Sequence, residues 1–322
     1  MSDYANQLAD SIGLDHIASA LATQKSFESA VESAQSGSMV LSACKLVTQE
    51  GKLDLSLVLM QGDAEETVGE EYTSRLLKFY NNQYFYTLYH KSLHLSEGFR
   101  QEASIRGFDL ASKAIQLASK HVRAAQTRLA GLINNGQNAA TVRSYVDDTP
   151  GLALFAANHL YGATTYSNLN VADFVSVANN IEVNDANLMA GVAAWMLAPD
   201  TDGAAGAYSN NLANILLLVS PNLFRTIKRL TENEILLSSA GVPFGPESRG
   251  LSWVMVPGLN NNIVVITRKP TDPVAGWYWG MDPWIHSAAK APDADRSVYK
   301  WTYARKWVVA PSGAQASYYL GP

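Results

Sequence analysis

One long amphipathic stretch constrains the fold of this 322-residue chain more than any other feature. Between residues 103 and 134, apolar side chains recur at alternating spacings of three and four, which places them on one face of a helix. The positions are Phe108, Ala111, Ile115, Ala118, Val122, Ala125, Leu129 and Leu132. Such a helix would extend about 48 Å, and "NNG" at 134–136 predicts a left-handed stop. The alanines predict close packing on a sheet, with a coiled coil as the alternative.

An extended hairpin is predicted before this helix. Residues 53–60 ("LDLSLVLM") and 84–95 ("YFYTLYHKSLHL") have strand-like patterns. The polar segment 62–75 between them has little to bury and forms the expected tip. Its acidic residues are Asp63, Glu65, Glu66, Glu70 and Glu71. Further upstream, the weak apolar stripe of residues 15–34 predicts a helix that belongs to an N-terminal arm.

The second half of the chain has the pattern of an α/β unit. Asn170 is expected to cap a short helix that carries Val171, Phe174, Val175 and Ala178. Residues 215–219 predict a buried strand, followed by a helix with Ser220 as N-cap and Pro221 in its first turn. Short strands separated by Gly, Pro and Asn turns follow at 251–259, 262–270, 276–284 and 297–321. The whole chain is therefore expected to be α+β.

Composition excludes several classes of protein. A 47% hydrophobic and 16% charged chain is typical of a folded protein with a core. The net charge of −5 gives no support for nucleic-acid binding through bulk positive charge. No apolar run approaches the roughly 20 residues of a membrane helix, and the N-terminus has no secretory signal pattern. The chain is thus expected to work in solution, initially in a reducing compartment. The single cysteine, Cys44, excludes multi-cysteine metal sites and is predicted to fill the core.

His159 is the one histidine whose surroundings suggest chemistry. It follows Asp147 and Asp148 in a turn-rich segment, and a histidine is the usual general base. The chain has no common nucleotide, metalloprotease or serine-hydrolase motif, and nothing nominates a nucleophile or metal beside His159. We therefore interpret it as a loop histidine bonded to backbone. An unfamiliar enzyme using His159 with Asp147 or Asp148 stays open as an alternative.

The other histidines have simpler interpretations. His90 and His94 share a strand face but would lie about 13 Å apart, which is too far for one metal ion. His121 is predicted on the polar side of the long helix, among basic residues. We accordingly expect no catalytic residue, no cofactor and no metal site.

The stretch "TPGLALFAANHLYGATTYSNL" (149–169) and the capped helix expected after it resemble the corresponding part of the Mu-type phage major head subunit family. The element order is similar to that of tailed-phage major capsid proteins with the Hong Kong 97-type fold. The resemblance implies an N-terminal arm (1–50), an extended hairpin loop or E-loop (51–97), a peripheral domain with the spine helix (98–140 and 291–322), and an axial domain (141–290). It also implies that His159 has a structural role in the fold and no catalytic one.

The same resemblance implies a function. Copies of the chain would self-assemble as hexamers and pentamers into the icosahedral head shell of a virion, built in the host cytoplasm. The shell would enclose double-stranded DNA without sequence-specific binding and without a membrane, with scaffold, portal and decoration proteins as further candidate partners. An encapsulin-like nanocompartment shell is the alternative with the same fold. A Lys–Asn cross-link, which some members make, has no position that we can locate.

Opposite charge is the basis on which we select candidate contacts between subunits, because it steers and registers identical chains. The acidic side is the hairpin tip with its five carboxylates. The basic candidates are Arg123 and Arg128 on the long helix, and Lys300, Arg305 and Lys306 near the C-terminus.

Overall fold

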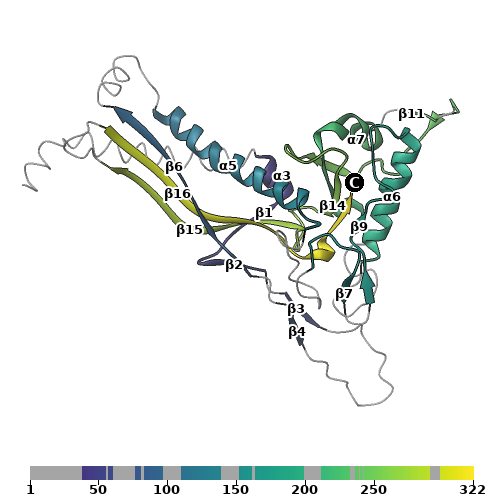
Figure 1. Cartoon of the computed structure of the whole chain (residues 1–322), viewed down its shortest axis with the longest axis horizontal. Helices are drawn as coiled ribbons and strands as arrows, with labels where there is room; N and C mark the ends of the chain where they lie inside the picture. Colours follow the sequence, from purple (N-terminus) through teal and green to yellow (C-terminus); the bar gives the residue numbers. More distant parts are fainter. Residues whose placement is uncertain are drawn as a thin grey trace, which may run out of the picture. The chain divides into compact units, whose positions relative to one another are not determined.

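A computed structural model describes most of the chain, and its described residues are coloured in Figure 1. They are 38–55, 57–60, 77–80, 83–96, 110–138, 152–161, 164–198, 212–232, 236–238, 240–241, 243–290 and 298–322. The chain divides into two compact units. The first comprises Met1–Ser38, Thr87–Ala124 and Asp282–Trp307; the second comprises Met39–Tyr86, Ala125–Met281 and Val308–Pro322.

In the first unit, a pair of long strands is joined to a helix through buried aromatic contacts. Strand β6 (Thr87–Ser96) pairs antiparallel with β16 (Val298–Pro311), from Thr87 opposite Trp307 to Ser96 opposite Val298. The Trp307 ring stacks on Tyr89 at 3.7 Å between centroids. Its indole N–H donates to His121 Nδ1 at 3.5 Å, and His121 belongs to helix α5 (Leu110–Asn134).

This contact corrects the prediction that His121 lies on the polar side of the helix. His121 is only 7% exposed, because it borders the apolar stripe at Val122 and accepts a hydrogen bond that a buried indole needs. The stripe itself is confirmed where side chains are described, since Val122, Ala125, Leu129 and Leu132 are all buried. Residues 103–109 of the predicted helix lie outside the described residues.

The end of α5 at Asn134 is also confirmed, but the predicted left-handed glycine is wrong. Gly136 is not among the residues with positive φ. It lies instead against the Phe155 ring, which a β-carbon at this position would overlap. The helix end is fixed by Asn134, whose amide donates to Gly258 O at 2.8 Å and accepts from Asn260 N at 2.9 Å.

A five-stranded sheet forms the centre of the second unit. Its strand order is β13 (Ser252–Met255), β10 (Ile215–Val219), β14 (Val264–Arg268), β17 (Ser317–Leu320) and β9 (Leu169–Asn170). Strand β10 is parallel to β13 and antiparallel to β14, and β17 is antiparallel to β14 and parallel to β9. All five residues of β10 are buried, so the predicted strand at 215–219 is confirmed.

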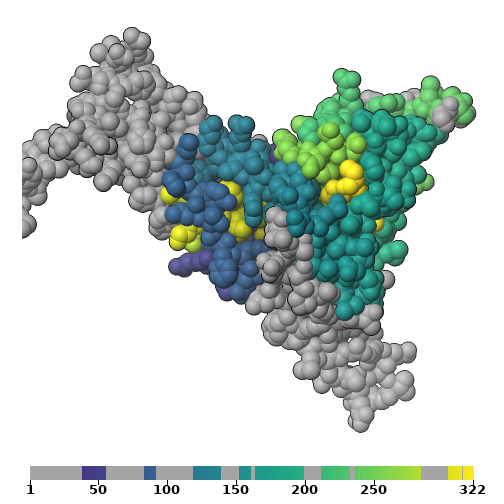
Figure 2. All heavy atoms as spheres, viewed as in Figure 1, coloured from purple at the N-terminus to yellow at the C-terminus, as the bar shows by residue number. Residues whose placement is uncertain are grey.

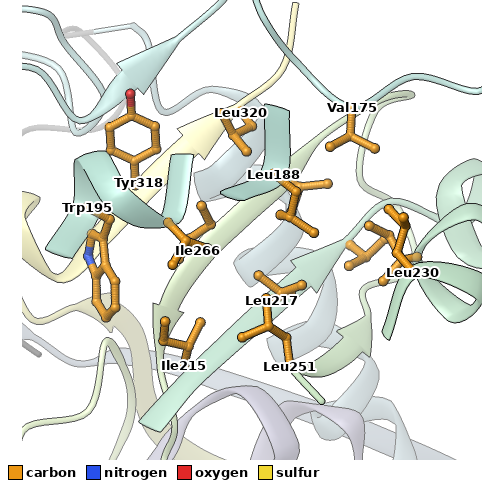
Figure 3. Close-up of a cluster of buried hydrophobic side chains, with 14 of the residues drawn as sticks. Val175, Leu188, Trp195, Ile215, Leu217, Leu230, Leu251, Ile266, Tyr318 and Leu320 are labelled. Atoms are coloured by element: carbon orange, nitrogen blue, oxygen red, sulfur yellow. The ribbon is translucent and has the colours of Figure 1, made fainter. Parts of the chain in front are cut away.

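Two helices complete the core of this unit. Helix α6 (Ile181–Met196) contacts β17 and β14, and α7 (Phe224–Thr231) contacts β13. Figure 3 shows Leu188 and Trp195 of α6 gathered with Leu217 of β10 and Ile266 of β14. Each of these side chains is fully buried, so the apolar faces of the helices and the sheet form one continuous core.

One of the two predicted helix starts in this unit is wrong. The helix capped by Asn170 does not form: residues 171–179 contain no helix, and Asn170 Oδ1 accepts from the N–H groups of Ala172 and Asp173. The true cap is Asn180, whose Oδ1 accepts from Val183 N at 2.8 Å. Ser220 does take the predicted N-cap position, with Pro221 after it, at the start of a 3₁₀ turn (Pro221–Leu223) that leads into α7. Its hydroxyl makes no capping bond, because it donates to Asn222 Oδ1 and accepts from Ile263 N.

The remaining elements are short or join the two long strands. The hairpin consists of β2 (Lys52–Asp54) on β5 (Gln83–Phe85) and β3 (Leu57–Met60) on β4 (Leu77–Tyr80), both antiparallel. The predicted second arm at 84–95 is therefore divided, because β6 pairs with β16 instead. A four-stranded sheet has the strand order β1 (Lys45–Thr48), β15 (Trp277–Lys290), β16 and β6. The others are α3 (Met39–Ala43), β7 (His159–Tyr161), β8 (Thr164–Tyr166), β11 (Leu236–Leu237), β12 (Pro243–Phe244), and 3₁₀ turns at Leu212–Asn214 and Ala314–Ala316.

Candidate functional site

His159 lies on a short strand rather than in the predicted loop. Strand β7 pairs antiparallel with β8, which places His159 opposite Tyr166. Its side chain is 0% exposed. Burial raises the pKa of the neighbouring Tyr166 phenol, and Tyr318 raises it further, so this phenol stays protonated. A general base must come within hydrogen-bond reach of a substrate, and a fully buried imidazole is shielded from one. Asp147 and Asp148 lie outside the described residues.

Substitution of His159 by alanine is expected to affect stability and not turnover. Removal of a fully buried side chain should cost about 1 to 3 kcal/mol of unfolding free energy, measured by urea denaturation. Hydrolytic activity of wild type and variant on generic ester and peptide substrates should be equally at background. A reproducible wild-type activity that disappears in the variant would contradict a purely structural role for His159.

The described residues offer little for metal or thiol chemistry. Among them, no group of three or more His, Cys, Asp or Glu side chains is placed to hold a metal ion. Cys44 is buried, and burial raises the pKa of its thiol, so it fills the core as predicted and is a poor nucleophile. His90 is exposed on β6. No helix in the described part of the chain is both long and apolar enough to cross a membrane.

The basic candidates for subunit contacts occupy two elements. Arg123 and Arg128 are both exposed on α5, where a separation of five residues places them about 140° apart around the helix axis. Arg305 and Lys306 are neighbours on β16; the first is half-buried and the second exposed. Strand β16 also carries Lys300, opposite His94, although the Lys300 side chain lies outside the described ones.

The charge on α5 has one sign. The helix contains no acidic residue, and its exposed positions include Lys120, Arg123 and Arg128. Such a surface favours an acidic partner. The five tip acids, Asp63, Glu65, Glu66, Glu70 and Glu71, lie outside the described residues, so their pairing with these cations stays a prediction.

Sequence reasoning missed the exposed apolar side chains of the second unit. Val171 and Val177 precede α6 and Val183 is in its first turn, whereas Met255 ends β13 and Phe224 packs against Trp253 of that strand. The signal in the sequence was weak, because valines and aromatic residues in short segments indicate core more often than surface.

Comparison with known proteins identifies the fold. No known family profile matches the sequence, and no curated protein matches it. Solved structures do. The virus-like particle from Pyrococcus furiosus is 10% identical, with a TM-score of 0.52 over 92% of this chain and 98% of that one. The capsid of an empty GTA particle is 13% identical, with a TM-score of 0.54 over 86% and 87% of the two chains.

A third structure agrees with these two. The mature capsid of bacteriophage PhiM1 is 15% identical, with a TM-score of 0.51 over 88% of this chain and 87% of that one. The chain has the Hong Kong 97-type capsid fold. Its mixed helices and sheets are the predicted α+β class, and the resemblance in element order is confirmed at the level of this fold. The finer resemblance to Mu-type heads stays a prediction.

Proposed function

We propose that this chain is the major capsid protein of a tailed phage, and that its copies self-assemble into the icosahedral shell around double-stranded DNA. The observation that carries the proposal is the structural similarity to capsid subunits over more than four fifths of the chain. The full burial of His159 supports a structural rather than a catalytic role for this residue. Copies would form hexamers and pentamers in a closed shell, because heterologous contacts close into rings.

The parts of the chain would divide this work. Residues 1–50 would be the arm, 51–97 the E-loop, 98–140 with 291–322 the peripheral domain, and 141–290 the axial domain. Helix α5 would be the spine helix. Strand β17 pairs with β14 and β9, so we assign Ser317–Leu320 to the axial domain in place of the peripheral one.

An encapsulin-like nanocompartment is the second candidate. Its support is the similarity to a virus-like particle from Pyrococcus furiosus, whereas the similarity to the PhiM1 capsid supports the phage capsid. The contents of particles distinguish the two. Particles isolated from the native source by rate-zonal sedimentation should protect DNA from added nuclease if they are phage heads, with scaffold, portal or decoration proteins in minor amounts. A protein cargo in a fixed ratio to the shell, without protected DNA, would favour the nanocompartment. Enzymatic turnover by the isolated, unassembled chain would contradict both shell functions.

The acidic tip should control assembly if it pairs with basic residues of a neighbouring subunit. Replacement of Asp63, Glu65, Glu66, Glu70 and Glu71 by Asn or Gln should slow shell formation, because the charge that steers the contact is lost. High salt should slow wild-type assembly in the same direction, since it screens exposed charges. Light scattering gives the rate, and thermal unfolding of the unassembled chain is the control for folding. Normal assembly of the neutralised variant at low salt would exclude the tip contact and leave the fold unaffected.

A further inference from the structure

Two exposed apolar patches lie at opposite edges of the five-stranded sheet. Strand β13 is one edge and β9 the other. The β13-edge patch consists of Phe224, Arg225, Arg229, Trp253 and Met255. The β9-edge patch is formed by the loop that leaves β9 and the first turn of α6; it consists of Val171, Asp173, Val177, Glu182 and Val183. In Figure 2, residues 152–198 in teal reach the surface over a broad area.

The β9-edge patch is held rigidly although it contains no regular element before α6. Asn184 bonds the Ser176 backbone in both directions, with its Nδ2 donating to Ser176 O at 2.8 Å and its Oδ1 accepting from Ser176 N at 2.9 Å. Asn179 and Asn187 both donate to Phe174 O at 3.1 Å. Val177 is nevertheless 60% exposed. A loop that is fixed by this many side-chain bonds and presents valines outward is preorganised for a contact.

The β13-edge patch is equally well supported. Phe224 packs edge-on against Trp253, with ring centroids 5.4 Å apart. Met255 lies two residues beyond Trp253 on the same strand, so both side chains point to one face of the sheet. Asn222, two residues before Phe224, donates to Asn262 Oδ1 at 2.7 Å and fixes the start of this segment.

The charges in the two patches indicate which patch would bind which. Arg225 and Arg229 are exposed and four residues apart, hence on one face of α7. The β9-edge patch carries Asp173 and Glu182 instead. Two β13-edge patches would bring arginines together, which disfavours a contact between identical patches. The two unlike patches carry opposite charges, and both contain exposed apolar side chains.

We propose that the β13-edge patch of one copy packs against the β9-edge patch of the next copy, with Arg225 and Arg229 facing Asp173 and Glu182. Because the two patches occupy opposite edges of one sheet, the contact is head-to-tail and repeats around a ring. The inference rests on the proposed function and deepens it, since it names the surfaces that join axial domains within a capsomer.

Charge reversal with rescue tests the contact. The pair Arg225→Glu with Arg229→Glu, and separately Asp173→Lys with Glu182→Lys, should each lower the yield of sedimenting shells at low salt by at least about tenfold. A chain with all four reversals should assemble to within about twofold of wild type, because every contact is again between opposite charges. Loss of folding cannot produce such a rescue. If a glutamate pair fails to fold, as judged by thermal unfolding, Arg225→Gln with Arg229→Gln replaces it, with the same expected loss.

Glu50→Lys is the matched control, because Glu50 is exposed and belongs to neither patch. Two results would overturn this contact, provided that wild type and Glu50→Lys still form shells. One is normal assembly of either reversed pair; the other is a chain with all four reversals that folds but stays unassembled. If wild type itself forms no shells under conditions in which it is folded, the proposed function fails and this inference falls with it.

Discussion

Trp195→Ala is expected to destabilise the second unit by about 3 to 5 kcal/mol, the usual cost of truncating a buried tryptophan. The Trp195 side chain is fully buried in the core between α6 and the sheet. Its indole N–H donates to Gln315 O at 3.0 Å. Alanine would leave a cavity and would also leave a buried carbonyl without this donor, so two costs add.

Urea denaturation of the unassembled chain measures the effect of Trp195→Ala. Leu197→Ala is the matched control, because this neighbouring side chain is 65% exposed and should change stability by no more than about 0.5 kcal/mol. A loss below about 1 kcal/mol for Trp195→Ala would show that the core shown in Figure 3 is not packed as described.

Gly276→Ala is expected to cost about 3 kcal/mol or more, because a β-carbon at this position has no room. It would overlap Thr267 Oγ1 and lie 3.1 Å from both Ala316 O and Arg268 N. Thr267 cannot easily move away, since its hydroxyl donates to Ala316 O at 3.0 Å and accepts from Ser317 Oγ at 3.1 Å. The strain would therefore spread to β14, the central strand of the sheet, and to its neighbour β17.

Gly131→Ala should have the opposite sign. A β-carbon on Gly131 would meet nothing within 4 Å, and the residue lies inside α5. Alanine in a helix interior is favoured over glycine by about 0.5 to 1 kcal/mol. Thermal unfolding of the two variants side by side should therefore lower the melting temperature for one and raise it for the other. Equal effects would contradict the close approach at Gly276.

The elements that could be predicted from sequence are those whose pattern is local and one-sided. The stripe of α5 repeats often enough to define a helix and its inward face. Strand β10 was found because five apolar residues end at a Ser-Pro pair. Helix α6 could not be predicted, because its own apolar residues and alanines are spread around the whole helix. No polar face therefore reveals the helical period. Asn170 precedes Val171 and Asn180 precedes Ile181, both β-branched apolar residues, so only the tertiary packing selects Asn180 as the cap.

The contacts of the candidate sites could not be predicted, because they join distant parts of the chain. His121 and Trp307 are 186 positions apart, and no local pattern indicates that a histidine among basic residues is buried beneath a tryptophan. The two sheet-edge patches likewise depend on strand order: β9 and β13 become opposite edges only after β17 joins the sheet from the end of the chain. Exposure of Val177 or Met255 follows from that arrangement and not from their residue types.

Cryo-electron microscopy of the purified wild-type chain is the direct test of whether this protein builds a capsid. We expect closed shells in which subunits with this fold are grouped around five-fold and six-fold positions. Within each group, the β13 edge of one sheet should face the β9 edge of the next. Folded protein that remains monomeric across the concentrations and salt conditions in which capsid subunits assemble, with no shell of any size, would contradict this expectation.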